Sequence, residues 1–179
     1  MSRNPHEFRE IYETHFGFVW SSLRRLGVRE PDVMDLTQKV FLTAHVKLSE
    51  FEGRSLLRTW LFGICQRTAS DYRRSARVRH EIATDVVELE RISADPEDHV
   101  AAGDSRRLAR VAETLLGKLP EPQRVVFVLF ELEELSGPEI AELLGVSVGT
   151  VRSRLRLARE AFRHEVKRLS LSGGRKEAV

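Results

Sequence analysis

The chain has 179 residues, a formal net charge of +2 and a single cysteine, Cys65, so it can form no intramolecular disulfide and fits a reducing compartment. Residues 1–20 mix acids with bases and contain no long apolar run, which predicts no signal peptide, no membrane insertion and a cytoplasmic location. Residues 1–80 hold 14 Lys and Arg against 9 Asp and Glu, residues 105–179 hold 14 against 10, and residues 81–104 hold 1 against 8, which indicates either two surfaces for a polyanion or two ordinary solvated faces.

The apolar residues recur at helical spacing, which predicts an all-α protein. A first helix begins near Pro5 and ends before Gly27, and a second helix begins at Pro31. We expect Ser55 to cap a third helix that ends in a basic run. Together these helices predict a first small domain over residues 1–80.

The second half of the chain begins with a change of composition. Residues 81–104 are acidic and show little periodicity, so we expect a flexible linker there. Asp104 is the predicted cap of the next helix, which opens a second small helical domain over residues 105–170. Residues 171–179 are predicted to be a disordered tail.

Residues 136–163 have the pattern of a helix-turn-helix. Ser136 and Glu139, three residues apart, form a capping box at the start of a short helix. Gly145 permits a tight turn, and Ser147 caps the helix that follows. This pattern predicts a second helix that enters the major groove of duplex DNA.

Basic and hydroxyl side chains lie on the predicted outer face of that second helix. Arginine can bond guanine through two hydrogen bonds, and serine or threonine can bond a base or a phosphate. The alternative is an amphipathic helix with a solvated basic face. The predicted duplex-binding residues are Ser147, Thr150, Arg152, Ser153, Arg154, Arg156 and Arg159.

Several strings on the chain resemble one protein family. The string from Glu139 to Leu155 resembles the promoter-reading end of extracytoplasmic-function (ECF) sigma factors, members of the sigma-70 family. The family's polymerase-binding helix is similar to Asp35-Leu36-Thr37-Gln38-Lys39-Val40-Phe41-Leu42, and its promoter-melting segment is similar to Phe51-x-Gly-x-Ser55 followed by Thr59-Trp60-Leu61-x-x-Ile64. The resemblance covers about residues 5–79 and 105–168. It implies sigma domain 2 in residues 1–80 and sigma domain 4, which reads the −35 duplex, in residues 105–170.

The resemblance implies that the second helix binds the clamp of the polymerase β′ subunit. An ordinary solvated helix edge is the alternative reading of the same residues. Lys39 stands where the family usually has Glu, a charge reversal that changes this contact. The implied polymerase-binding residues are Asp35, Leu36, Gln38, Lys39 and Phe41.

The resemblance also implies that the third helix and the loop before it hold the unpaired strand of the −10 element. Rings can stack on bases there, and arginines can bind phosphates. Trp60 also fits a core position, and Arg67 stands where the family often has Asn, which implies an altered −10 preference. The implied −10 residues are Phe51, Arg54, Ser55, Arg58, Trp60, Arg67, Asp71, Arg73, Arg74 and Arg77.

The implied partners are core RNA polymerase (β′ clamp and β flap), promoter DNA and an anti-sigma factor, with a monomer when free. We expect no cofactor, no metal and no catalysis, because the sequence has neither a Gly-rich phosphate loop nor metal-ligand spacing. The alternative is a free-standing helix-turn-helix repressor or activator, usually a dimer. Such a protein needs a dimer surface or ligand pocket in its first 80 residues.

Overall fold

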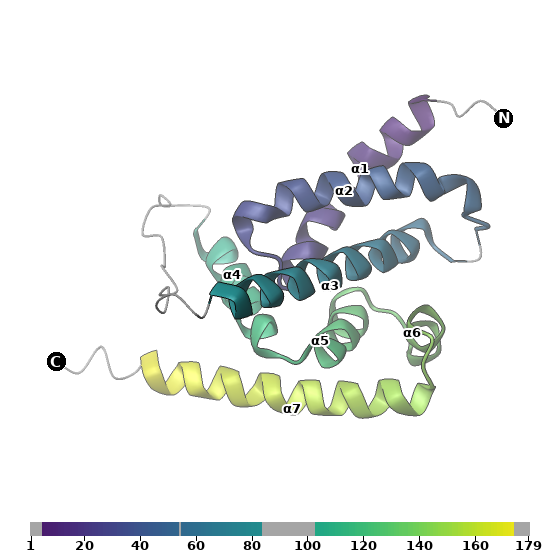
Figure 1. The fold of residues 1–179 in the computed structure, drawn as a ribbon. Helices are drawn as coiled ribbons and strands as arrows, with labels where there is room; N and C mark the ends of the chain where they lie inside the picture. Colours follow the sequence, from purple (N-terminus) through teal and green to yellow (C-terminus); the bar gives the residue numbers. More distant parts are fainter. Residues whose placement is uncertain (1–4, 54, 84–102, 174–179) are drawn as a thin grey trace.

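Every regular element among residues 5–53, 55–83 and 103–173, which the computed structural model describes, is a helix. The expected all-α fold class is therefore confirmed. Among the helices of these ranges, none is long and apolar enough to cross a membrane. Figure 1 shows the helices in two groups, one from each half of the chain, that lie against each other.

The N-terminal group is a bundle of helices that pack on one another. Its elements are α1 (Pro5–Arg25), α2 (Glu30–Lys47), the short 3₁₀ turn η1 (Leu48–Glu50) and α3 (Leu57–Ala83). Val19 and Leu23 of α1 and Cys65 of α3 are fully buried, as the helical spacing of the apolar residues predicts. Burial raises the pKa of the Cys65 thiol, so this residue stays protonated and serves as a small apolar core group.

Gly27 ends α1 in a Schellman motif. Its φ of +90° lies in the left-handed region that glycine tolerates best. The Gly27 amide donates to the Arg24 carbonyl (2.9 Å), and the Val28 amide donates to the Leu23 carbonyl (3.1 Å). The carbonyl of Leu26 takes no part in this motif and is available to another partner.

Two predicted helix starts differ from the structure. The second helix begins at Glu30, one residue before the predicted Pro31. The third begins at Leu57, and the Ser55 hydroxyl donates weakly to the Leu56 carbonyl (3.5 Å). Ser55 is therefore not the cap of α3, because its hydroxyl bonds a carbonyl beside it and no amide of the first helical turn.

The C-terminal group is built around the last helix. Its elements are α4 (Gly103–Lys118), α5 (Glu121–Phe127), the π-helical turn η2 (Val128–Leu132), α6 (Gly137–Leu144) and α7 (Val148–Gly173). α7 packs against α4, α5 and α6. Ile140 of α6 and Val151 and Ala158 of α7 are buried at the centre of this packing.

The helices extend into segments that were predicted to be irregular. α3 continues to Ala83 and α4 begins at Gly103, so both ends of the predicted linker 81–104 are helical. Asp104 consequently lies inside α4 and does not precede it. α7 continues to Gly173, so the first part of the predicted tail 171–179 is helical and that prediction was wrong there. Residues 84–102 and 174–179 lie outside the described residues.

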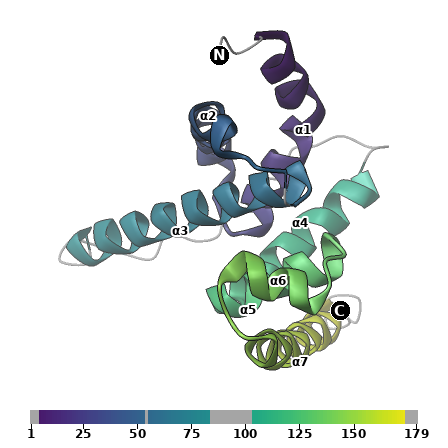
Figure 2. The same cartoon turned by 90° about the vertical axis from the view of Figure 1, so that its right-hand side faces the viewer.

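The two halves share one contiguous cluster of buried apolar side chains. α1 contacts α4, and α3 lies beside α5 and α6 in both views (Figures 1 and 2). Leu26 and Phe62 of the first half and Leu129 of the second half belong to this cluster and are fully buried. The two halves are therefore packed into one body in this structure.

Candidate nucleic-acid interface

The start of α6 has the predicted capping box. The Ser136 hydroxyl accepts a hydrogen bond from the Glu139 amide (3.5 Å), and the Glu139 carboxylate accepts from the Ser136 amide (2.8 Å). The Ser136 hydroxyl also lies 2.6 Å from that carboxylate, and these bonds lower the pKa of Glu139. The local sequence alone thus fixes where this helix begins.

The turn between α6 and α7 also agrees with the sequence. Gly145 adopts φ +63°, and the Val146 amide donates to the Ala141 carbonyl (3.0 Å). Ser147 caps α7, because its hydroxyl accepts from the Thr150 amide (3.0 Å). The helix-turn-helix prediction is confirmed in its caps and its turn.

The outer face of α7 carries the predicted duplex-binding residues. Arg152 and Ser153 are exposed near its N-terminal end, while Arg154 is half-buried. Arg156 pairs with Glu160 along the helix (2.8 Å). The exposed residues of the predicted set are Ser147, Arg152, Ser153, Arg156 and Arg159, and the half-buried ones are Thr150 and Arg154.

Arg159 is fixed by two neighbours in the second half. Its Nε donates to the Glu131 carboxylate (2.6 Å), and its guanidinium lies 5.2 Å from the centroid of the Phe130 ring. Within the described part of the chain, Arg152 has no such partner. Arg152 is therefore an exposed arginine of this face that a base edge can engage without first displacing a carboxylate.

The predicted polymerase-binding residues divide into two groups on α2. Asp35, Gln38 and Lys39 are exposed and Leu36 is half-buried. Phe41, in contrast, is only 3% exposed and packs against the Tyr12 ring, with 4.6 Å between centroids. The Phe41 side chain thus belongs to the core between α1 and α2 in the free chain, and its direct contact with polymerase stays a prediction.

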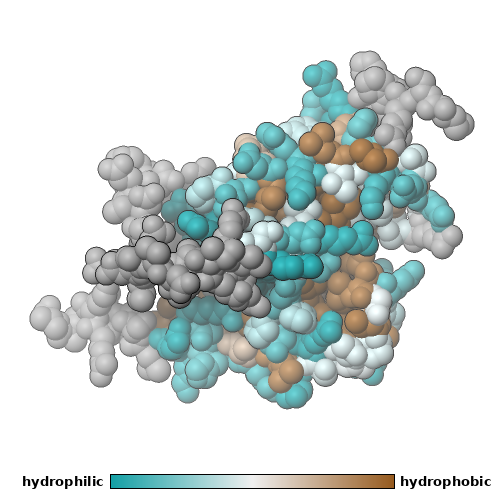
Figure 3. All heavy atoms as spheres, in the orientation of Figure 1, coloured by the Kyte–Doolittle hydropathy of each residue, from teal (hydrophilic) through white to brown (hydrophobic). Residues whose placement is uncertain are grey.

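Sequence reasoning missed an apolar strip on the same helix. Met34, Leu42 and Val46 are 44%, 68% and 66% exposed. With Gln38 they follow one another at four-residue spacing, so they share one face of α2. Figure 3 shows apolar patches among polar residues over the part formed by α1 and α2. The sequence did contain a signal for this strip, because these apolar residues are additional to those that form the buried stripe of α2.

The aromatic part of the predicted −10 site is brought together. Phe51, in the loop, and Trp60, on α3, have ring centroids 5.3 Å apart, and both are half-buried. Trp60 packs against the core on one side, as the alternative reading expected. One pair of rings thus lies at the junction between the loop and the start of α3.

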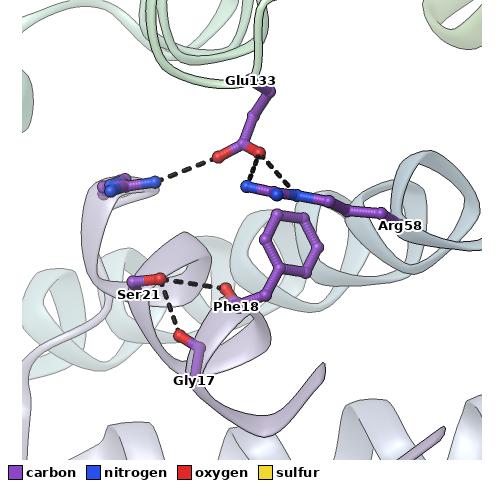
Figure 4. Close-up of polar contacts among 6 residues, drawn as sticks. Gly17, Phe18, Ser21, Arg58 and Glu133 are labelled. Carbon is purple, nitrogen blue, oxygen red and sulfur yellow. Dashed lines mark hydrogen bonds and ion pairs between the residues drawn. The ribbon is translucent and has the colours of Figure 1, made fainter. Parts of the chain in front are cut away.

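The arginines of the predicted −10 site are in different environments. Arg67 and Arg74 are exposed, and Arg74 pairs with the exposed Asp71 (3.2 Å). Arg58 instead pairs with Glu133 of the second half (Figure 4), and Arg73 pairs with Glu121 of the same half. Ser55 is exposed. Arg54 and the side chain of Arg77 lie outside the described residues.

Arg67 and Arg154, which were predicted to read different promoter elements, line one cavity of about 310 Å³ between the halves. Glu121 and Gln66 also line it. The structure thus brings together a predicted −10 residue and a predicted −35 residue, which the sequence reasoning treated as belonging to separate sites.

Comparisons with known proteins identify a family region in each half of the chain. Residues 11–79 match the family Sigma-70 region 2, and residues 109–162 match Sigma-70, region 4. The RNA polymerase sigma factor CnrH of Cupriavidus metallidurans is 36% identical over 88% of this chain and 85% of its own length. The ECF RNA polymerase sigma-E factor of Escherichia coli is 35% identical over 83% of this chain and 81% of its own.

Solved structures show the same fold. CnrH in complex with the cytosolic domain of CnrY matches 92% of this chain and 90% of its own, with a TM-score of 0.66 and 27% identity. RpoE of Bartonella quintana, solved with the anti-sigma factor NepR, has a TM-score of 0.67 over 90% of this chain and 97% of its own, and at 22% identity it supports the fold alone. The chain therefore belongs to the ECF sigma factors of the sigma-70 family, which are transcription initiation factors and not enzymes.

Proposed function

We propose that this ECF sigma factor reads promoters at two places while bound to core RNA polymerase. Sigma domain 2, residues 1–80, binds polymerase and opens the −10 element, and sigma domain 4, residues 105–170, reads the −35 duplex. The observation that carries this proposal is the capped helix-turn-helix with a basic outer face on α7, on the same chain as a basic α3. Polymerase supplies the chemistry of nucleotide transfer.

The −35 element is read by the N-terminal part of α7. Arg152 is exposed and free of carboxylates within the described residues, so its guanidinium can bond a guanine edge in the major groove. Ser147 and Thr150 at the helix start suit a phosphate or base contact. Arg156 pairs with Glu160, and Arg159 pairs with Glu131. These two arginines can bind DNA phosphates when a phosphate replaces the glutamate. Ser153 and Arg154 complete the proposed set.

Polymerase binds the exposed face of α2. Asp35, Gln38 and Lys39 supply polar contacts, and Leu42 and Val46 supply apolar area that has no cover within the described residues. An apolar centre with a polar rim is typical of protein interfaces. Leu36 contributes in part, and Phe41 acts indirectly by holding α2 on α1. We assign the clamp of the β′ subunit to this face and the β flap to the second domain.

The −10 strand is held by the loop before α3 and by α3 itself. Phe51 and Trp60 offer rings for stacking, and Arg58, Arg73 and Arg74 offer phosphate partners. We assign the exposed Arg67 to a base edge. Base stacking with nearby cations is the general way in which proteins hold single strands. Arg54, Ser55, Asp71 and Arg77 belong to the proposed set through the resemblance.

The remaining partners follow from the family. We propose an anti-sigma factor that hides these surfaces, a monomeric free chain, and action in the cytoplasm with polymerase on nucleoid DNA. The solved complex of the similar CnrH with the cytosolic domain of CnrY supports a bound partner protein of this kind.

The test is transcription in vitro from a promoter library, with core polymerase free of sigma factor. We expect initiation only when the chain and core polymerase are both present, and weak or no duplex binding by the chain alone. A free-standing repressor predicts the reverse: no assembly with core polymerase and tight binding to an operator without it. The Leu42→Asp variant is the matched negative control, because it alters the exposed face of α2 and leaves the core unchanged.

A further inference from the structure

We propose that Glu133 is an intramolecular substitute for promoter phosphates, which closes the free chain by pairing with Arg58 and Arg25 across the two halves. This inference rests on the proposed function, because it concerns how the same −10 site is kept unavailable. The closed arrangement must open before the chain can read a promoter.

Glu133 lies at the junction of the two halves with its side chain only 3% exposed. Its Oε1 accepts from Arg25 Nη1 of α1 (3.0 Å), and its Oε2 accepts from Arg58 of α3 through Nη2 (2.7 Å) and Nε (3.1 Å). The Arg58 guanidinium also covers the Phe18 ring, 4.4 Å from its centroid (Figure 4). A buried carboxylate is tolerated where cations and hydrogen bonds compensate it, as they do here.

An unusual backbone places Glu133 there. The π-helical turn η2 ends in a bond from the Glu133 amide to the Val128 carbonyl (3.1 Å), and Glu134 follows with φ +56°. Glu134 is the non-glycine residue with positive φ among the described residues, a conformation that is unfavourable for a residue with a Cβ. Wide turns and strained residues are common beside functional groups. The strain is consistent with a carboxylate that must point toward the first half.

Other ion pairs between the two halves also join an arginine of the first half to a glutamate of the second. Arg24 of α1 binds Glu113 of α4 through Nη2 (2.7 Å) and Nε (2.9 Å). Arg73 of α3 pairs with Glu121 at the start of α5. In each case the arginine belongs to the first half and the glutamate to the second. Carboxylates of the second half therefore cover the basic face of the first half.

Two of these arginines, Arg58 and Arg73, belong to the proposed −10 site. Arg58 remains 55% exposed and Arg73 20% exposed, so solvent, and hence a phosphate, can reach Arg58 while Glu133 holds it. A DNA strand must displace Glu133 and Glu121 to bind both arginines. Glutamate and phosphate are both oxyanions that pair with the same guanidinium fork, so they compete directly.

The closed arrangement also conflicts with the length of a promoter. The −10 and −35 elements lie about 25 base pairs apart, roughly 85 Å along B-form DNA. A compact chain of this length has a radius of gyration of only about 16 Å. Arg67 and Arg154 nevertheless line one cavity in the structure. The halves must therefore separate when the chain reads both elements, and the contacts of Glu133 must break.

The test compares three variants of the full chain without polymerase. Glu133→Gln removes the charge at the junction, and Glu113→Gln does the same at the second contact, which lies outside the proposed DNA sites. Glu165→Gln is the matched control: Glu165 is a part-buried glutamate, 17% exposed, whose partners Lys118 (2.8 Å) and Arg168 (2.9 Å) lie in its own half. Small-angle X-ray scattering gives the radius of gyration, and fluorescence anisotropy gives the affinity for a single-stranded −10 oligonucleotide.

We expect Glu133→Gln to enlarge the radius of gyration and to bind the oligonucleotide about tenfold more tightly than the natural chain, since it loses charged hydrogen bonds across the junction. Glu113→Gln should change both readouts in the same direction, and Glu165→Gln should change neither. Unchanged size and affinity in the two junction variants, with helical circular dichroism retained, would overturn the proposal, as would an equal change in Glu165→Gln. If the Glu133→Gln chain is expanded but directs no initiation with core polymerase, the proposal about Glu133 stands and the proposed function is refuted.

Discussion

Arg124 of the second half donates from Nη1 to the carbonyl oxygen of Leu26 at the end of α1, a bond of 2.9 Å between residues 98 apart in sequence. Its Nη2 donates to the carbonyls of Gly117 (2.7 Å) and Leu119 (2.8 Å). Arg124 is 6% exposed, and burial, followed by the charge of Arg73, lowers its pKa to about 10. It remains charged at neutral pH and joins the α1 terminus to the α4–α5 turn.

The first prediction concerns Gly27, which lies against this arginine. A Cβ at Gly27 would clash with the Arg124 guanidinium, and its φ of +90° is strained for any other residue. We expect Gly27→Ala to lower the free energy of unfolding by about 2 kcal/mol or more, as measured by urea denaturation. Gly17→Ala is the control: Gly17 lies within α1 with open space around it, so alanine there should raise stability by up to about 1 kcal/mol. Equal effects of the two changes would refute this account of Gly27.

The second prediction concerns the exposed face of α2. Leu42→Ala should weaken the affinity for core polymerase by about 1 kcal/mol or more and leave the free energy of unfolding unchanged, because Leu42 is 68% exposed. Leu108→Ala on α4 is a matched control, since that leucine is 69% exposed and lies on another surface. Fluorescence titration of labelled core polymerase measures the affinity of both variants, and urea denaturation measures their free energy of unfolding. Equal binding by the two variants would remove α2 from the polymerase contact.

The third prediction separates Phe41 from its neighbours. Phe41→Ala should lower the free energy of unfolding by about 3–5 kcal/mol, because it empties a packed site between α1 and α2. Gln38→Ala, on the exposed face, should change stability by less than about 0.5 kcal/mol. Thermal unfolding followed by circular dichroism measures both effects. A stable Phe41→Ala chain that fails to bind polymerase would restore the direct contact that the structure argues against.

The fourth prediction concerns acid. The pKa of Glu139 is lower in the folded chain than its ordinary value of 4.5, because it accepts hydrogen bonds from Ser136. A lowered folded pKa gives stability that is present above pH 4.5 and is lost as the pH falls through the folded value. Ser136→Ala should cost about 1 kcal/mol near neutral pH through loss of the cap. It should also reduce the pH dependence of unfolding below pH 4.5, and an unchanged pH profile would contradict the capping box.

How far the sequence predicted this molecule depended on distance along the chain. The capping box of Ser136 and Glu139 and the turn at Gly145 involve neighbours within a few residues, so residue types alone determine them. Helix existence followed from apolar periodicity for the same reason. Helix ends were less well predicted, as Ser55 and Gly173 show, because tertiary packing extends or shortens a terminal turn.

The contacts across the junction could not be read from the sequence. Glu133 and Arg58 are 75 residues apart, and their pairing depends on a π-helical turn and a left-handed glutamate that no residue pattern announces. The inward position of Phe41 could not be predicted for a related reason: the family motif includes this residue, but only the packing of α1 on α2 shows that its side chain points inward. Motifs identify which residues matter, and packing decides how each one acts.

The measurement that tests the two-site account most directly is promoter selection from a random library by the reconstituted holoenzyme, repeated with Arg152→Ala and Arg67→Ala. The account predicts two motifs at a fixed spacing, with base preference relaxed by about 1–3 kcal/mol in the upstream motif alone for Arg152→Ala. Arg67→Ala should alter the downstream motif alone. A single selected motif, or the same motif altered by both variants, would contradict the claim that α7 and α3 read separate promoter elements.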